Sequence, residues 1–519
     1  MTGPRAETKR VASKYFITTA IDYSNGEPHL GHAYEKIGAD CVARYRRLRG
    51  EDVYFSIGMD EHGQKVAQAA EEAGQDPQAW VDRIAAAFEA AWEELAISHD
   101  VFIRTTEPRH ERAVKELFHR IQQGGYISEG VYSGYYCVGC EAFKVDKDLV
   151  DGKCPTHPTR EIKWVEEPNY FFEVGRFRQK LLDLYRTQPD FVQPKPKYNE
   201  IHNVVDEWTE DQKISVSRAR VPWGIPWPDD DTHVVYVWFE ALINYLSVTG
   251  FPDAGHEATW PADVHVIGPD IVRFHAAMWP AMLMAADIEV PRQVWSHGWV
   301  NTGGARFSKS AGVAVTLRNL IDRHGVDALR YFVLREIPWN ADGNFTWERF
   351  DTRYTSELAD GYGNLVSRVV AMIIRYLGGT VPQGADPTPL DTFGDECIAG
   401  YREAMDAHLL HVGADHAWRL VDRANGFIEE RAPWTLAKQG QSAELEETLG
   451  ALARCIARVT LMAAPFMPGK TQEVWAALGL PGEVQAARWE DLERPPTGGR
   501  QVEKLPPLFP KPPKGAASQ

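Results

Sequence analysis

Apolar residues in the N-terminal part of the chain form short continuous runs separated by longer stretches with helical spacing. The run KYFITTAI (14–21) is aromatic and β-branched and predicts a buried strand, and the runs at 53–57 and 102–104 predict two more. The stretch 33–48 has apolar residues at helical spacing and predicts a helix. Strands and helices that alternate through short links are typical of an α/β protein with a doubly wound, Rossmann-like parallel sheet.

The alternation stops after residue 125 and resumes with strand-like runs at 233–238 and 264–268. From residue 332 onward such runs disappear, and amphipathic stretches at 354–377, 396–417, 418–430 and 446–462 predict an all-α bundle. Residues beyond 484 are rich in proline and glycine and indicate a tail. The expected organisation is a Rossmann-like domain in two halves (14–125 and 231–330), an insertion (126–230), a linking segment (331–365), an α-helical domain (366–483) and a tail (484–519).

Composition supports a multidomain globular enzyme. A chain of 519 residues is too long for one core, and 44% hydrophobic with 25% charged residues is typical of a soluble protein. There is no apolar run long enough to span a membrane and no export signal within the first 13 residues, so we expect a cytoplasmic protein without a membrane partner. The net charge of -17 argues against coating nucleic acid, but it leaves room for a local face that contacts one RNA.

The insertion contains a candidate metal site. Cys137 and Cys140 are separated by two residues, and Cys154 and His157 follow with the same separation after a loop. Two short knuckles of soft ligands are typical of a tetrahedral zinc site, and four protein ligands make such a site closed and structural. The alternative is four unrelated residues that include a buried thiol.

A candidate nucleotide site lies where the first strand gives way to the first helix, at the sequence HLGH (29–32). His29 and His32 are three residues apart and share one face of the first helical turn. That turn also carries unpaired N–H groups and the positive end of the helix dipole, which favour phosphate. Gly31 would let a flat ring or a ribose approach the backbone. An ordinary polar helix start remains the alternative.

Further polar and apolar positions follow other strand ends, where doubly wound sheets bind ligands. Asp60 follows the second strand and is suited to an ammonium group, although a helix N-cap explains it equally well. Two helical stripes also begin at strand ends: Trp238, Ala241, Leu242 and Tyr245, then Ile271 and His275. The glycine-led loop 303–310 carries Lys309, which could neutralise phosphate charge. The alternatives are an apolar core for the stripes and an ordinary surface loop for 303–310.

Several of these motifs together resemble a known family. HLGH (29–32) and RFSKS (306–310) resemble the two signature motifs of class I aminoacyl-tRNA synthetases. The resemblance is closest to the methionine-specific family among them, and it covers roughly residues 14–480. It rests on AIDYSNG (20–26), DEHG (60–63), the two knuckles, YVWFEA (236–241), the stretch 267–275 and APW (432–434).

The resemblance implies a role for each matching position. His29 and His32 would stabilise the α-phosphate while a methionine carboxylate attacks it, and Lys309 would hold the departing pyrophosphate. Asp60 would bind the methionine ammonium. The ATP site would comprise His29, Gly31, His32, Asp270 (at the ribose), Arg306, Ser308 and Lys309. The side-chain pocket would comprise Ala20, Ile21, Tyr23, Trp238, Ala241, Leu242, Tyr245, Ile271 and His275. The helical domain would bind the tRNA anticodon through Asn364, Arg368 and Trp434, although Trp434 would otherwise be interpreted as a core aromatic.

The implied reaction is the ATP-dependent formation of methionyl-adenylate and transfer of methionine to the 3′ end of tRNA(Met), with release of AMP and pyrophosphate. The implied cofactors are one structural Zn²⁺ and Mg²⁺ with ATP, and we expect a monomer. Three positions depart from the family pattern, which usually has Lys-Met at Arg306 and Phe307, Lys at Pro269 and Asp at Glu240. The role of Arg306 is therefore the least secure.

Three other functions remain as rivals. A synthetase for another apolar amino acid would usually carry a larger editing insertion than 126–230. A nucleotidyltransferase that never binds tRNA would not need the helical domain. A zinc-bearing RNA-binding protein without activity would not need His29, His32 and Lys309.

Overall fold

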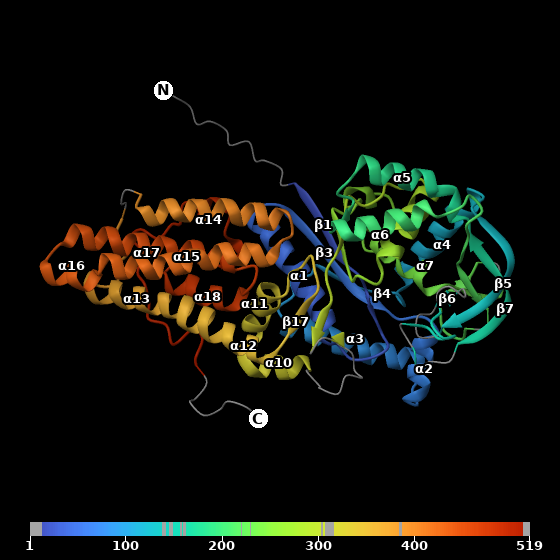
Figure 1. The fold of residues 1–519 in the computed structure, drawn as a ribbon, viewed down its shortest axis with the longest axis horizontal. Helices are drawn as coiled ribbons and strands as arrows, with labels where there is room; N and C mark the ends of the chain where they lie inside the picture. Colours follow the sequence, from blue (N-terminus) through green and yellow to red (C-terminus); the bar gives the residue numbers. More distant parts are fainter. Residues whose placement is uncertain are drawn as a thin grey trace, which may run out of the picture.

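The protein is elongated, with a helical bundle at one end, a parallel sheet in the middle and an antiparallel insertion at the other end (Figure 1). The computed structural model describes residues 13–137, 142–144, 149–155, 158, 162–219, 221–228, 230–302, 305–306, 316–383 and 387–511. Within these residues, no helix is long and apolar enough to cross a membrane.

The central sheet is parallel throughout, which confirms the predicted fold class. Its strands run in the order β4 (Val101–Arg104), β3 (Asp52–Asp60), β1 (Lys14–Thr19), β13 (Val264–Ile267), β14 (Val294–Ser296) and β8 (Val192–Gln193). β2 (Asp22–Tyr23) continues from β1 along the last two residues of β3. Ile17 on β1 is fully buried and pairs with Phe55 on one side and Val264 on the other.

The strand order reverses between β1 and β13. The chain proceeds from β1 to β3 and β4 on one side, and from β13 to β14 on the other side. Ligands of doubly wound sheets bind at such a switch point, outside the carboxyl ends of the strands. The segments that follow β1, β3 and β13 therefore form the candidate site.

The helices of the sheet domain pack around this sheet. They are α1 (Leu30–Leu48), α2 (Gln64–Glu72), α3 (Pro77–Glu94), α4 (Pro108–Gln123), η2 (Val174–Phe177), α5 (Arg178–Thr187), α6 (Lys195–Asp206), α7 (Val237–Ala241), α8 (Asn244–Ser247), η3 (His256–Ala258), the π-helical turn η4 (Phe274–Met278) and α9 (Trp279–Ala285). Local signals start some of them. Asp76 caps α3 by accepting hydrogen bonds from the backbone N–H groups of Gln78 and Ala79.

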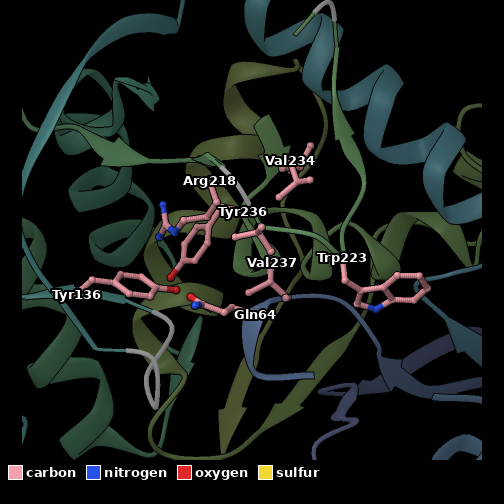
Figure 2. Close-up of a pocket in the computed structure, with 10 residues that line it drawn as sticks. Gln64, Tyr136, Arg218, Trp223, Val234, Tyr236 and Val237 are labelled. Atoms are coloured by element: carbon pink, nitrogen blue, oxygen red, sulfur yellow. The ribbon is translucent and has the colours of Figure 1, made fainter. Parts of the chain in front are cut away.

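The insertion forms two small antiparallel sheets. One has the order β6 (Ala142–Lys144), β5 (Ile127–Cys137), β7 (Lys163–Phe172) and β9 (Ile214–Ser215), and the other has the order β10 (Ser217–Ala219), β12 (Asp230–Val235) and β11 (Pro226–Trp227). Figure 2 shows where this part meets the sheet domain: Tyr136, Arg218 and Tyr236 gather on one side of a small hollow, and Trp223 lies on the other.

Two strands differ from the sequence prediction. The run 233–238 was expected as a strand of the Rossmann-like domain, but β12 ends at Val235 and pairs in an antiparallel sheet. β8 lies within the range expected for the insertion, yet it forms the edge of the central sheet. An apolar run predicts a strand but does not identify the strand with which it pairs, and a two-residue strand is too short to show a periodicity.

The C-terminal part is helical, as predicted, with one short sheet beside it. That sheet consists of β16 (Ala305–Arg306), β15 (Val300–Thr302) and β17 (Gly343–Phe345). The helices are α10 (Leu317–His324), α11 (Val326–Glu336), α12 (Trp347–Arg353), the π-helix η5 (Tyr354–Gly363), α13 (Asn364–Leu377), α14 (Pro389–Asp406), α15 (Leu410–Arg431), α16 (Pro433–Gln439), α17 (Ser442–Ala463), α18 (Pro468–Ala477), η6 (Val484–Ala486) and α19 (Trp489–Glu493).

One predicted helix boundary in the bundle is wrong. We expected helices at 396–417 and 418–430, but α15 runs continuously through residue 418 and the turn lies at 407–409. His408 makes that turn with a φ of 56°, a conformation that glycine or asparagine usually supplies. Because no glycine or proline marks the turn, the sequence carried no signal for it.

Residues beyond α19 pack along the bundle. Leu508 and Phe509 are buried, and the Tyr354 hydroxyl donates a hydrogen bond to the Pro510 carbonyl oxygen over 2.8 Å. The described part of the expected tail thus covers the start of η5, the π-helix that leads into α13.

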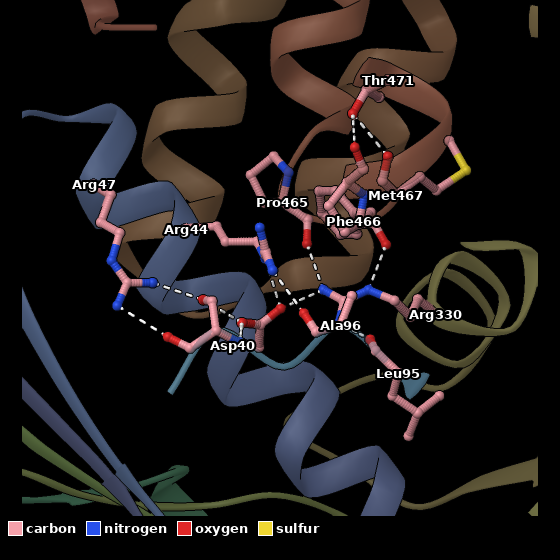
Figure 3. A network of polar contacts seen from close by, with 12 residues as sticks. Asp40, Arg44, Arg47, Leu95, Ala96, Arg330, Pro465, Phe466, Met467 and Thr471 are labelled. Carbon is pink, nitrogen blue, oxygen red and sulfur yellow. Dashed lines mark hydrogen bonds and ion pairs between the residues drawn. The ribbon is translucent and has the colours of Figure 1, made fainter. Parts of the chain in front are cut away.

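A buried polar network joins α1 to the bundle (Figure 3). Arg330 on α11 has no exposed surface and donates to the Asp40 carboxylate on α1 over 2.5 Å. Its other N–H groups donate to the carbonyl oxygens of Leu95, Pro465 and Phe466 over 2.9–3.1 Å. The same carboxylate oxygen also accepts from Arg44 over 2.7 Å. A single side chain therefore connects α1, the end of α3 and the junction between α17 and α18.

We predict that Arg330→Met lowers the free energy of unfolding by about 3–5 kcal/mol, because it removes one partner of a buried ion pair and leaves three carbonyl oxygens without their donor. Urea-induced unfolding followed by tryptophan fluorescence measures the change. The control is Arg318→Met: this arginine is 64% exposed, pairs with Asp322, and should contribute less than about 1 kcal/mol. Equal small effects from both variants would contradict the role of the network.

Candidate active site

The two histidines of HLGH lie together at the start of α1. His29 is the N-cap, and its Nδ1 accepts a hydrogen bond from the Gly31 N–H over 3.1 Å. The His29 N–H in turn donates to His32 Nδ1 over 3.4 Å, and the two rings stack with centroids 3.7 Å apart. Since both Nδ1 atoms accept, each neutral imidazole carries its proton on Nε2. Both rings can therefore donate a hydrogen bond at the positive end of a helix dipole.

Gly31 lies beneath these rings. A Cβ atom there would come within 2.9 Å of His29 Cε1, closer than real Cβ contacts, so only glycine fits without moving the ring. The absence of a side chain at this position thus preserves the stacking of His29 and His32.

Asp60 ends β3 on the other side of β1 from β13. It is buried, and Tyr23 pairs with it across β2 and β3. The Asp60 carbonyl oxygen accepts from the Ser24 N–H over 2.9 Å, and the Tyr23 hydroxyl donates to the His62 carbonyl oxygen over 3.1 Å. The structure therefore brings the Asp60 carboxylate to the same sheet edge as the segment that leads from β1 to α1.

The residues of the expected side-chain pocket pack against one apolar core. Ala20, Ile21, Tyr23, Trp238 and Ile271 are half-buried against it, and Leu242 and Tyr245 belong to it. The Trp238 ring stacks on Phe274, with centroids 4.3 Å apart and planes within 2°. Ala241 is buried at the end of α7. Elements after β1, β12 and β13 thus supply one group of half-exposed apolar side chains.

His275 is buried and holds a fixed tautomer. Its Nδ1 donates to the Ile271 carbonyl oxygen over 3.0 Å, so Nε2 accepts from the Tyr245 hydroxyl over 2.7 Å. Burial lowers the pKa of His275 to about 4. Tyr245 also stacks on His265, whose pKa burial holds well below its ordinary value. The two histidines are therefore uncharged at neutral pH.

A buried lysine behind the site was missed by the sequence analysis. Lys36, one turn beyond His32, donates to the Ala20 carbonyl oxygen over 2.9 Å, to Asp22 Oδ1 over 3.0 Å and to Glu35 Oε1 over 2.9 Å. Three acceptors satisfy the three N–H groups of the ammonium. Lys36 thereby fixes the segment after β1 to α1. The spacing of residues in the sequence gave no hint of these contacts, because Asp22 and Ala20 precede Lys36 by 14 and 16 residues.

The small hollow of Figure 2 lies beside this site but does not include the expected pocket residues. It is lined by residues 63–64, Tyr136, Arg218, residues 221 and 223, and residues 234–237. Its volume of about 10 Å³ holds at most about one water molecule. The Arg218 guanidinium lies 4.2 Å from the Tyr236 ring centroid and donates to Ser215 Oγ over 2.8 Å.

Some of the expected site residues lie outside the residues that the structure describes. Ser308, Lys309, Cys140 and His157 lie outside the described residues, and only the backbone of Arg306 is described, paired with Asn301 across β15 and β16. Cys137 and Cys154 are buried. Among the residues that the structure describes, no group of three His, Cys, Asp or Glu side chains is arranged to hold a metal. Asp270 is exposed just after β13.

The expected anticodon residues lie on the bundle. Asn364 is exposed at the start of α13, and Arg368 on the same helix donates to Glu429 over 2.7 Å. Trp434 is 42% exposed on α16, at the end of the bundle remote from the central sheet (Figure 1). That exposure is unlike a core aromatic, so the alternative interpretation of Trp434 loses support.

We predict that His275 makes the protein acid-sensitive. In the unfolded chain a histidine binds a proton near pH 6.5, whereas folded His275 does so only near pH 4. Between these two pH values the unfolded state binds a proton that the folded state does not. The free energy of unfolding therefore decreases by about 1.4 kcal/mol for each unit by which the pH is lowered. In urea titrations at pH 7, 6 and 5, His275→Gln should lose this contribution and approach the wild type in stability as pH falls. His119→Gln, at an exposed position on α4, is the control, and parallel pH curves for wild type and His275→Gln would refute the prediction.

Comparison with known proteins identifies the family. The protein family described as tRNA synthetases class I (M) matches residues 15–163 and 158–370 of this chain. A protein of Thermotoga maritima named methionine--tRNA ligase is 40% identical over 511 residues, which cover 96% of this chain and 80% of that protein. One of Streptomyces coelicolor with the same name is 39% identical over 527 residues, 97% of each chain. The structure of Mycobacterium tuberculosis methionyl-tRNA synthetase in complex with methionyl-adenylate superposes with a TM-score of 0.91 at 38% identity, over 96% of this chain and 100% of that one. The chain belongs to the methionyl-tRNA synthetase family of class I aminoacyl-tRNA synthetases.

Proposed function

We propose that the protein activates methionine with ATP to methionyl-adenylate and then transfers the methionyl group to the 3′ end of tRNA(Met). One observation carries the proposal. The stacked His29 and His32 pair follows β1, and the Asp60 carboxylate ends the neighbouring strand β3, beside the reversal point of the central sheet. Trp238, on the helix after β12, completes the apolar group by stacking on Phe274, which follows β13. A phosphate-binding helix start, an ammonium-binding carboxylate and an apolar pocket are what the reactants of this step require.

The chemistry of activation needs little covalent help from the protein. A methionine carboxylate oxygen attacks the α-phosphorus of ATP, a new O–P bond forms, and the bond to pyrophosphate breaks. Asp60 pairs with the ammonium, and the apolar group holds the thioether. The Nε2–H groups of His29 and His32 donate to the α-phosphate oxygens, where negative charge increases in the transition state.

The remaining contacts to ATP come from the positions given by the family resemblance. Lys309 would neutralise the departing pyrophosphate, Arg306 and Ser308 would add contacts to ATP, and Asp270 would bind the ribose. Mg²⁺ bound with ATP would add positive charge at its phosphates. In the second step a ribose hydroxyl of the terminal tRNA adenosine attacks the methionyl carbonyl carbon, and AMP leaves.

The zinc assignment is part of the same proposal. Cys137 at the end of β5 and Cys154 after it are buried, as thiolate ligands of a closed site are, and Cys140 and His157 would complete four ligands. Zinc bound by four protein ligands would stabilise the fold of the insertion and take no part in the chemistry. The protein acts as a cytoplasmic monomer in this proposal.

We predict that ATP–pyrophosphate exchange by the purified protein depends on methionine and is barely supported by leucine or isoleucine. Apolar pockets distinguish side chains by about 1–3 kcal/mol per methylene, so homocysteine should be the main error. His29→Ala and Lys309→Ala should each slow exchange by roughly 10²–10³-fold, as for the loss of one preorganised donor, while methionine binding measured at equilibrium changes little. Exchange with leucine alone would exclude the proposed substrate, and near-normal exchange by either variant would exclude the role of that residue.

We predict that Trp434→Ala impairs charging of tRNA(Met) by about 5- to 150-fold, because stacking of one base on an aromatic ring contributes roughly 1–3 kcal/mol. Methionine-dependent ATP–pyrophosphate exchange should not change, since α16, which carries Trp434, lies at the end of the bundle remote from the central sheet (Figure 1). Ile374→Ala, a partly exposed apolar position on α13, is the matched control for surface truncation. Arg368→Ala should also weaken charging, and if its partner is a phosphate the difference from wild type should shrink at high salt, because the variant makes one phosphate contact fewer.

The same preparation of Trp434→Ala separates the two interpretations of this residue. An anticodon contact predicts loss of charging with exchange and melting temperature intact. A structural residue predicts that charging, exchange and melting temperature fall together, and that outcome would reject the anticodon role.

A further inference from the structure

A buried carboxylate lies between two histidines next to the proposed methionine pocket. Glu240 on α7 has no exposed surface. Its Oε1 lies 2.8 Å from His62 Nδ1, and its Oε2 lies 3.0 Å from His110 Nε2 on α4. His110 Nδ1 lies 3.0 Å from Ser247 Oγ on α8. Both carboxylate oxygens are therefore engaged, and the contact joins residues that are 178 and 130 positions apart in the chain.

The charge of this group is retained by its partners. Burial raises the pKa of Glu240, but the neighbouring His62 and the hydrogen bonds of both imidazoles outweigh that effect and bring it below its ordinary value. Burial lowers the pKa of His62, and the Glu240 charge more than reverses this. A buried ionic contact of this kind costs desolvation free energy, so it contributes more to fixed geometry than to stability.

The contact connects the two parts of the proposed methionine pocket. His62 follows Asp60 by two residues, and its carbonyl oxygen accepts from the Tyr23 hydroxyl. Glu240 lies between Trp238 and Ala241 on α7. The side chains that would contact the ammonium and the side chains that would enclose the thioether are thus joined through one hydrogen bond of 2.8 Å.

Other contacts hold the same loop in place. The Trp223 indole N–H donates to the Glu61 carbonyl oxygen over 2.6 Å, and Arg104 donates to the Glu61 carboxylate over 2.7 Å. The Trp223 contact ties the loop to the insertion, and the Arg104 contact ties it to the end of β4. Among the side-chain contacts described for Asp60–Gly63, the one between His62 and Glu240 reaches the helix that carries Trp238.

We propose that His62 and Glu240 form a positioning pair that sets the separation between the ammonium-binding carboxylate and the thioether pocket. Two methylene groups separate the Cα atom of methionine from its sulfur, so the ammonium site and the thioether pocket must lie within a limited range of distances. The pair therefore acts on recognition of the amino acid, and neither residue belongs to the proposed ATP site. The proposal rests on the proposed function, because it assumes that methionine binds between Asp60 and Trp238.

The test uses steady-state ATP–pyrophosphate exchange with methionine and ATP varied separately. Glu240→Gln keeps the size of the side chain and removes its charge, and His62→Asn keeps a donor near the position of Nδ1 with a different reach. We expect each to raise the KM for methionine by at least about 10-fold, since a displacement of 1 Å in a reactive complex costs up to about 10²-fold. The KM for ATP should stay within about twofold. The double variant should be no worse than the more affected single variant, because both remove the same contact.

Two further variants separate positioning from plain stability. Glu240→Asp retains the carboxylate charge, so its KM for methionine should lie between those of the wild type and Glu240→Gln. If Glu240→Gln folds poorly, the KM of Glu240→Asp still tests the role of the charge. His110→Asn removes the other imidazole from the same carboxylate without touching the loop 60–63, so it should lower the melting temperature while the KM for methionine stays within about threefold. The proposal is overturned if the KM for methionine and for ATP rise together, or if His110→Asn has the same effect on methionine as His62→Asn.

The variant Trp238→Ala distinguishes a failure of this proposal from a failure of the proposed function. If Trp238→Ala raises the KM for methionine and the variants of His62 and Glu240 do not, the pocket is correct and the positioning role is wrong. If Trp238→Ala leaves the KM for methionine unchanged, methionine does not bind where both proposals place it, and both are rejected.

Discussion

The structure depends on how helix α1 is held. Its first turn carries His29 and His32, which need a fixed orientation at the edge of the sheet, while its middle carries Asp40 in the protein interior. A buried carboxylate is tolerated only when paired, and Arg330 and Arg44 supply that pairing. Because Arg330 also binds backbone carbonyls of Pro465 and Phe466, the helix that presents the histidines is attached to the bundle by the same contacts. Movement of the bundle relative to the sheet would break a charged network, so the two parts behave as one unit at this junction.

The arrangement places the two proposed functions far apart, one at the central sheet and one at the outer end of the bundle (Figure 1). The carboxyl ends of β1 and β13 lie at the central sheet, and α16, which carries Trp434, lies at the remote end of the bundle (Figure 1). Long helices such as α15 and α17 span that distance and pack on each other. The segment that ends near Pro510 adds contacts to η5, directly before the helix that carries Asn364 and Arg368. An RNA contact at the tip would therefore be held at a fixed distance from the start of α1.

Local patterns in the sequence were sufficient for the fold class and for the residues near strand ends. The strand-to-helix transition at His29 and the position of Asp60 followed from hydrophobic runs and from the rule that parallel sheets bind ligands at their carboxyl edge. The contacts that hold those residues could not be predicted in this way. Glu240 and His62 are 178 positions apart, Asp40 and Arg330 are 290 apart, and no spacing rule connects them. The turn at His408 was missed for a different reason, since its backbone adopts a glycine-like conformation without a glycine.

The distribution of charge in the site fits a reactant that is charged at one end only. In the proposed site Asp60 would supply negative charge for the ammonium of an amino acid, while burial keeps His275 and His265 on the pocket side neutral. The Tyr245 hydroxyl is oriented toward His275, and its own pKa is raised well above the usual value by burial, so it stays a neutral donor. Lys36, a buried cation behind the site, has its three N–H groups occupied by Ala20, Asp22 and Glu35. A charged side chain would enter such a pocket without a partner and would bear the full cost of desolvation, whereas a thioether would not. The pocket thus favours an uncharged, flexible side chain for two reasons. His275, His265 and Tyr245 are kept neutral, and the walls of the pocket are apolar.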